Sequence, residues 1–103
     1  DIYIDDSIKD YIVRIVTATR NPDEYGLKGM VEYGASPRGS IYLNKAARGY
    51  GFLQGRGYVL PEDIKVMATD VLRHRIILSY EAEAKGMTAD EVIGRILEGV
   101  PVP

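Results

Sequence analysis

The chain has 103 residues, of which 46% are hydrophobic and 27% charged, with no cysteine and a formal net charge of −2. This composition is that of a single soluble globular domain, and it excludes a disordered chain, a disulfide scaffold and a thiolate metal site. The net negative charge argues against a nucleic-acid-binding module, and the lack of a long apolar run or a secretory signal predicts a cytoplasmic protein with no membrane partner.

The N-terminal region predicts an amphipathic helix from about residue 6 to residue 19, capped by Asp5 or Asp6. Apolar residues recur there at helical spacing and predict one buried face: Ile8, Tyr11, Ile12, Ile15 and Val16. Pro22 cannot continue the helix. The following segment, about residues 23–35, contains three glycines and predicts a loop with a short strand at Met30–Tyr33.

A second helix is predicted from about residue 37 to residue 53, opening at Ser36-Pro37-Arg38. Serine is a favoured N-cap and proline is favoured at the first helical position. On a helical wheel, Lys45 and Arg48 lie near Arg38 and form a basic face. The small and apolar residues gather on the other side and predict the buried face: Leu43, Ala46, Ala47 and Tyr50.

The C-terminal half predicts two further helices and one strand. Pro61-Glu62-Asp63 opens a third helix, which Thr69-Asp70 is expected to divide into two short ones. Ile76–Tyr80 is expected to pair with Met30–Tyr33 as a strand, and Thr88 with Glu91 three residues on predicts a capping box for the last helix. The predicted fold is mainly α, a small bundle of four to five helices with a short two-stranded β pairing (about residues 30–33 with 76–80).

Arg38 is the strongest candidate for a functional residue. A cation in the first turn of a helix faces the positive end of the helix dipole, and residues that break a local rule often lie at functional sites. Helix N-termini also bind anions through their free N–H groups. No acidic residue occurs between Glu32 and Glu62, whereas the same stretch carries Arg38, Lys45, Arg48 and Arg56. Arg38 is therefore predicted as a phosphate ligand; a solvent-facing arginine is the alternative.

Other chemistry has little support in the sequence. There is no phosphate-binding P-loop motif, so this chain alone is not expected to be catalytic. The one histidine, His74, lies between Arg73 and Arg75, whose charges disfavour a bound metal ion. A helix-turn-helix interpretation would place Glu62 and Asp63 where DNA phosphates lie, so no nucleic-acid partner is expected.

Several sequence blocks follow one another in an order that covers almost the whole chain. They are Tyr11-Ile12-Val13, Ala18-Thr19-Arg20, Gly34-Ala35-Ser36-Pro37-Arg38, Ala46-Ala47-Arg48, Gly55-Arg56-Gly57-Tyr58-Val59, Pro61-Glu62-Asp63, Val71-Leu72-Arg73-His74-Arg75-Ile76 and the stretch from Leu78 to Pro103. In this order they resemble the C-terminal lid domain of MoxR-family AAA+ ATPases, in the clade of the magnesium-chelatase ATPase subunit. Two positions depart from the family: Gly39 replaces the usual alanine and Leu60 the usual threonine cap.

The resemblance implies that residues 1–103 are a single lid domain, excised from a longer ATPase whose P-loop core is absent. It implies that Arg38 is the sensor-2 arginine, which reads the γ-phosphate of ATP. Tyr11 and Ile12 match positions on the adenine side, although core residues would look the same. ATP and Mg²⁺ are then cofactors of the full-length parent, and neither is expected to bind tightly to this fragment.

The resemblance also implies partners: the protein's own AAA+ core, neighbouring subunits of a hexameric ring, and von Willebrand factor A-type proteins. The implied activity is chaperone-like remodelling or cofactor insertion. Arg73 and Arg75 are either contacts to the core or a neighbouring subunit, or cations that suit a helix C-terminus. The alternative function is a free-standing helical adaptor that binds an acidic protein surface through Arg38, Lys45, Arg48 and Arg56.

Overall fold

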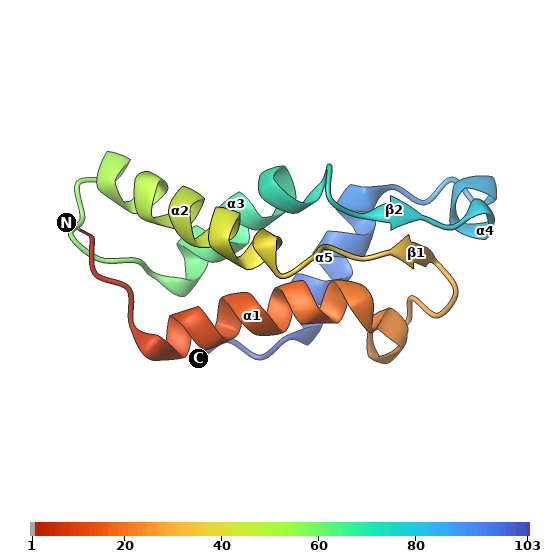
Figure 1. Ribbon diagram of the computed structural model, residues 1–103, viewed down its shortest axis with the longest axis horizontal. Helices are drawn as coiled ribbons and strands as arrows, with labels where there is room; N and C mark the ends of the chain where they lie inside the picture. The colour runs from red at the N-terminus through yellow and green to blue at the C-terminus, as the bar shows by residue number, and fades with distance from the viewer. Residues whose placement is uncertain (1) are drawn as a thin grey trace.

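Helix α1 (Asp6–Arg20) forms one long edge of the molecule (Figure 1), and its predicted cap and apolar face are confirmed. The computed structural model describes residues 2–103. Asp5 caps the helix, its carboxylate accepting a hydrogen bond from the backbone N–H of Ser7 at 3.0 Å. Every residue of the predicted apolar face is buried. The 3₁₀ helix η1 (Pro22–Tyr25) follows α1. It was not predicted and lies mostly in the segment expected to be a loop.

Helices α2 (Arg38–Leu53) and α3 (Pro61–Leu72) form a hairpin that lies along α1 (Figure 1). α2 begins one residue later than predicted, and the expected capping by the Ser36 side chain is wrong. The Ser36 carbonyl instead accepts from the Gly39 N–H at 2.8 Å, so a backbone turn starts the helix. The predicted break at Thr69-Asp70 is also wrong, because α3 continues through both residues to Leu72.

The predicted β pairing is confirmed at the end of the molecule far from the N-terminus (Figure 1). Strands β1 (Val31–Tyr33) and β2 (Ile77–Leu78) run antiparallel, with Tyr33 opposite Ile77. The predicted strand extends too far at its C-terminal end. Ser79 ends β2 and caps a short helix, α4 (Tyr80–Ala84), by accepting from the Ala82 N–H at 3.1 Å.

Helix α5 (Ala89–Gly99) packs against α1 and α3 and completes the core. The described residues therefore form five α-helices and one small sheet, which agrees with the predicted fold. The capping box is confirmed: the Glu91 N–H donates to the Thr88 hydroxyl at 3.2 Å, and the Thr88 N–H donates to the Glu91 carboxylate at 3.3 Å. Val92, Ile93 and Ile96 are fully buried in the same cluster as the α1 face. No helix among residues 2–103 has the length and apolar content to cross a bilayer.

Candidate functional site

Arg38 is the first residue of α2 and is exposed to solvent. Within residues 2–103 no acidic side chain lies within ion-pair distance of it. Its charge therefore remains uncompensated at the positive end of the α2 dipole, an arrangement that costs free energy unless an anion is present. The structure thus retains the feature that made Arg38 a candidate from sequence.

The segment before Arg38 is fixed to the end of α1 by Thr19, which is fully buried. The Thr19 hydroxyl accepts from the Ala35 N–H at 2.8 Å and donates to the Val16 carbonyl at 2.6 Å. Gly34 approaches the same turn so closely that a Cβ there would lie 2.3 Å from the Thr19 carbonyl oxygen. A glycine and a threonine from two elements therefore set where α2, and with it Arg38, begins.

A groove of about 310 Å³ lies between α1 and α2. Its lining combines apolar and polar side chains from both helices: Lys9, Ile12, Val13, Ser40, Ile41, Asn44, Lys45 and Arg48. Ile41, Lys45 and Arg48 follow Arg38 at helical spacing, so all four share one stripe of α2. We call this set the cationic stripe. In the groove, Ile41 contributes to an apolar wall, and Lys45 and Arg48 lie along that wall as cations. None of the lining residues carries a carboxylate.

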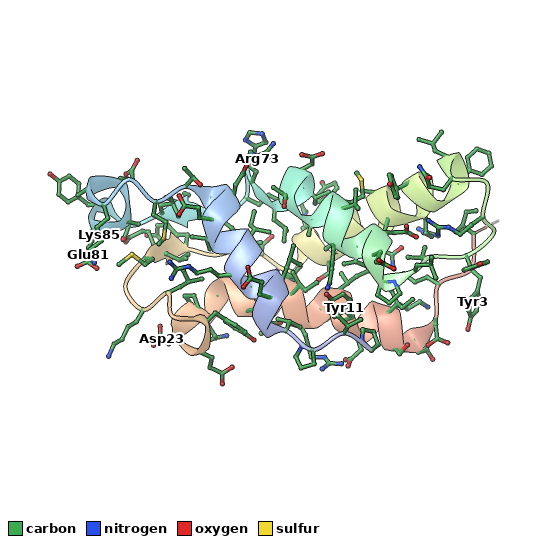
Figure 2. All side chains as sticks on the ribbon, turned by 180° about the vertical axis from the view of Figure 1, so that it is seen from behind. Tyr3, Tyr11, Asp23, Arg73, Glu81 and Lys85 are labelled. Atoms are coloured by element: carbon green, nitrogen blue, oxygen red, sulfur yellow. The ribbon has the colours of Figure 1, made fainter. Side chains whose placement is uncertain are left out.

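The two residues predicted for the adenine side occupy different places. Ile12 is 1% exposed but still lines the groove, whereas Tyr11 is fully buried in the middle of the molecule (Figure 2) and does not line it. Among the described residues no hydrogen-bond partner reaches the Tyr11 hydroxyl. Burial raises the pKa of this phenol, which stays protonated. Of the two, only Ile12 is placed to touch a ligand in the groove.

Arg56 does not belong to the cationic stripe, contrary to the basic surface expected for an adaptor. Its guanidinium donates to both carboxylate oxygens of Asp63, each at 2.6 Å, and Asp63 is 2% exposed. Asp63 also accepts from the Leu60 N–H at 2.8 Å and so caps the start of α3, where the Leu60 side chain has no hydrogen-bonding group. Burial opposes ionisation of Asp63, but the hydrogen bonds from Arg56 and Leu60 outweigh it and hold the pKa of this carboxyl below its usual value. Arg56 is therefore structural.

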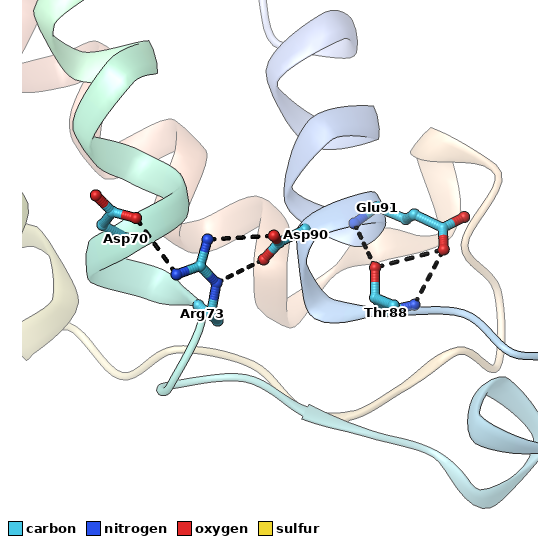
Figure 3. A network of polar contacts seen from close by, with 5 residues as sticks. All are labelled: Asp70, Arg73, Thr88, Asp90 and Glu91. Carbon is cyan, nitrogen blue, oxygen red and sulfur yellow. Dashed lines mark hydrogen bonds and ion pairs between the residues drawn. The ribbon is translucent and has the colours of Figure 1, made fainter.

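Arg73 and Arg75, which look equivalent in sequence, differ in the structure. Arg73 donates to Asp90 at 2.7 and 3.1 Å and to Asp70 at 3.3 Å, and so ties the end of α3 to the start of α5 beside the Thr88 cap (Figure 3). The hydrogen bond from Arg73 lowers the pKa of Asp90. Arg75 forms no such pair among residues 2–103; its guanidinium carbon lies 4.0 Å from the centre of the Tyr42 ring.

The sequence did not predict the structural roles of Thr19 and Asp63, nor the apolar wall of the groove. Ile41 could have been found, because it repeats the spacing of the cationic stripe. Asp63 carries a partial signal, since an acid at the third helical position often accepts from the cap N–H. Nothing local marks Thr19, whose partner Ala35 lies 16 positions away. Among residues 2–103 no group of three or more His, Cys, Asp or Glu side chains could hold a metal ion.

Residues 25–96 match the family described as the AAA lid domain. The chain is 41% identical to Chaperone MoxR1 of Mycobacterium tuberculosis over 98% of its length, and 44% identical to the uncharacterized protein YeaC of Bacillus subtilis over 100%. It is 34% identical to Protein MoxR of Methylorubrum extorquens over 94%.

These alignments cover 28%, 30% and 31% of the three relatives, so the chain spans less than a third of their length. A solved structure from Cytophaga hutchinsonii, described as a candidate ATPase, superposes with a TM-score of 0.93 at 48% identity. That match covers 99% of this chain and 32% of the other.

Proposed function

This chain belongs to the AAA lid domain family, in the group of MoxR ATPases, and on that premise we propose that it is the nucleotide-responsive lid of a longer ATPase. Arg38 is its sensor, which binds the γ-phosphate of ATP. The observation that carries the proposal is the exposed, unpaired guanidinium of Arg38 at the start of α2, held in place by Thr19 and Gly34.

The physical basis is the difference between ATP and ADP. A guanidinium donates charge-assisted hydrogen bonds to phosphate oxygens, each contributing about 1.5–3 kcal/mol. Arg38 makes these bonds with ATP and loses them with ADP, so the nucleotide favours one lid position over the other. The lid responds because only one of its two positions brings Arg38 to the terminal phosphate.

The groove beside Arg38 supplies the rest of the proposed site. Its apolar wall, with Ile12 and Ile41, suits one face of the adenine, whereas Tyr11 is buried and does not reach the groove. Lys45 and Arg48 make the groove electropositive and so attract the nucleotide, while Arg38, one turn before Ile41, is the residue proposed for the terminal phosphate. The Mg²⁺ that accompanies ATP neutralises phosphate charge, and acids outside this chain would have to hold it, since the groove offers none.

The proposed cycle needs partners beyond this chain. The lid packs on the protein's own AAA+ core and on neighbouring subunits of a hexameric ring, and its movement remodels a client protein or inserts a cofactor. One relative is named a chaperone, which supports a remodelling role. Von Willebrand factor A-type proteins are the proposed partners, and the cytoplasm is the proposed location.

The proposal is tested by Arg38→Ala in the full-length protein. We expect ATP turnover to fall about 10- to 100-fold, the loss of one charge-assisted contact. The melting temperature should change little, because Arg38 is exposed and makes no ion pair among the described residues. Arg14→Ala, which removes an exposed arginine paired only with Asp10 on α1, is the matched control. Wild-type turnover in Arg38→Ala would refute the assignment.

A further inference from the structure

Arg75 lies close to the start of α2 although it follows the end of α3. The hairpin brings the end of α3 back to that point, where a Cβ on Gly39 would lie 3.4 Å from Leu72 Cδ2. The backbone N–H of Arg75 donates to the Leu72 carbonyl at 2.9 Å, and this hydrogen bond fixes the turn after α3. Its side chain reaches Tyr42, one helical turn beyond Arg38.

The contact with Tyr42 fixes the guanidinium of Arg75 without using its hydrogen bonds. A guanidinium lying over an aromatic ring interacts through its face, and its N–H groups remain free in the plane. Arg73, two residues earlier, uses its donors on Asp70 and Asp90. No carboxylate lies within 4.0 Å of Arg75 among residues 2–103. Arg75 is thus held in place but unpaired.

The surroundings of Arg75 form a cleft of about 490 Å³, lined by Tyr42, Asp70, Val71, His74 and Arg75. The one acid in it, Asp70, lies 3.3 Å from Arg73 and is compensated there. The cleft therefore offers an incoming anion the free donors of Arg75. A planar cation with fixed orientation and unused N–H groups is suited to phosphate, which it can bind through two parallel hydrogen bonds.

We propose that Arg75 is a second phosphate-binding residue of the lid, positioned by Tyr42, and that it binds the same nucleotide as Arg38. The inference rests on the proposed function. Tyr42 stands four residues after Arg38, so the two side chains are neighbours on one face of α2. Arg75 lies against that tyrosine. A phosphate beside the Tyr42 ring would therefore meet Arg75 from the end of α3 and Arg38 from the preceding turn of α2, which is the arrangement that the proposal requires.

The test measures the dissociation constants of ATP and ADP for the full-length protein with a fluorescent nucleotide. Arg75→Gln should weaken ATP binding about tenfold or more, the loss of one charge-assisted contact. Tyr42→Leu should weaken it in the same direction, because Arg75 loses its platform. Tyr42→Phe keeps the ring and should bind like the wild type. Arg14→Gln is the control for loss of a surface charge, and thermal melting checks that each variant is folded.

The double variant Arg38→Gln/Arg75→Gln tests whether both arginines hold one anion. Residues that share a ligand couple, so the combined loss should differ from the product of the single losses. If Arg38→Gln weakens ATP binding and Arg75→Gln does not, this inference fails and the proposed function stands. If neither weakens it, both fail. If Arg75→Gln lowers subunit association in sedimentation while nucleotide affinity is unchanged, Arg75 contacts a neighbouring subunit and the inference is overturned.

Discussion

Four arginines near the α2–α3 hairpin fall into two groups that the sequence does not distinguish. Arg56 and Arg73 are paired with aspartates and join elements of the fold, whereas Arg38 and Arg75 form no ion pair among residues 2–103 and face outward near the start of α2. Paired cations contribute to stability, and unpaired ones remain available for a ligand. For these four arginines, the pairing state, rather than the position in a basic stretch, separates structural from functional candidates.

Among the paired arginines, the largest expected effect comes from removing Asp63, the partner of Arg56. Asp63→Ala leaves the Arg56 guanidinium without its partner and the Leu60 N–H without an acceptor. Only the aspartate of this pair is buried, the Arg56 side chain being 20% exposed, so removing Asp63 costs about 3 kcal/mol, the lower end for a buried ion pair. We expect chemical denaturation at pH 7 to show a loss of that size, with ATP affinity of the folded protein unchanged. A loss below about 0.5 kcal/mol, the size of an ordinary surface substitution, would show that this pair does not hold the fold.

The same pair predicts a pH dependence. The folded protein holds the pKa of Asp63 below its usual value, so the stabilisation is fully present above the ordinary aspartate pKa of about 3.9 and is lost as the pH falls towards the lower folded value. The stability difference between the wild type and Asp63→Asn should therefore shrink between pH 5 and pH 3. A difference that grows as the pH falls would contradict the direction of this shift.

The predictions from sequence were most accurate for features that depend on residues close together in the chain. The α1 face, the Thr88 capping box and the β pairing follow from spacing and cap residues, and each is confirmed. The wrong predictions concern features that depend on backbone hydrogen bonds or on residues further along the chain. The Ser36 carbonyl, not its side chain, opens α2, and Arg56 in a basic stretch is paired with an acid seven residues away. Pairing between distant side chains cannot be derived from periodicity.

Gly34 bears on the unpaired group, because it lets the chain before Arg38 pass against the end of α1. In Gly34→Ala the new Cβ would lie 2.3 Å from the Thr19 carbonyl oxygen and 2.7 Å from the Arg20 nitrogen. The backbone must shift, which costs about 2–3 kcal/mol. We expect denaturation to show this loss and ATP turnover of the full-length protein to fall as well, since Arg38 moves with the segment.

Gly49 provides the matched control, since nothing lies within 4 Å of a Cβ added there. Gly49→Ala lies inside α2 and should raise the stability by about 0.5–1 kcal/mol without changing turnover. If Gly34→Ala and Gly49→Ala have the same effect, the close approach at Gly34 does not position Arg38.

Thr19 gives the smallest of the expected losses of stability and tests how the segment before Arg38 is held. Thr19→Val keeps the shape but removes the acceptor of the buried Ala35 N–H, which costs about 1–2 kcal/mol. Thr19→Ser keeps the hydroxyl and should retain most of that stability. If the hydroxyl sets the start of α2, Thr19→Val weakens ATP binding more than Thr19→Ser, at a temperature where both are folded. Equal ATP affinity in the two variants would mean that Thr19 stabilises the fold without positioning Arg38.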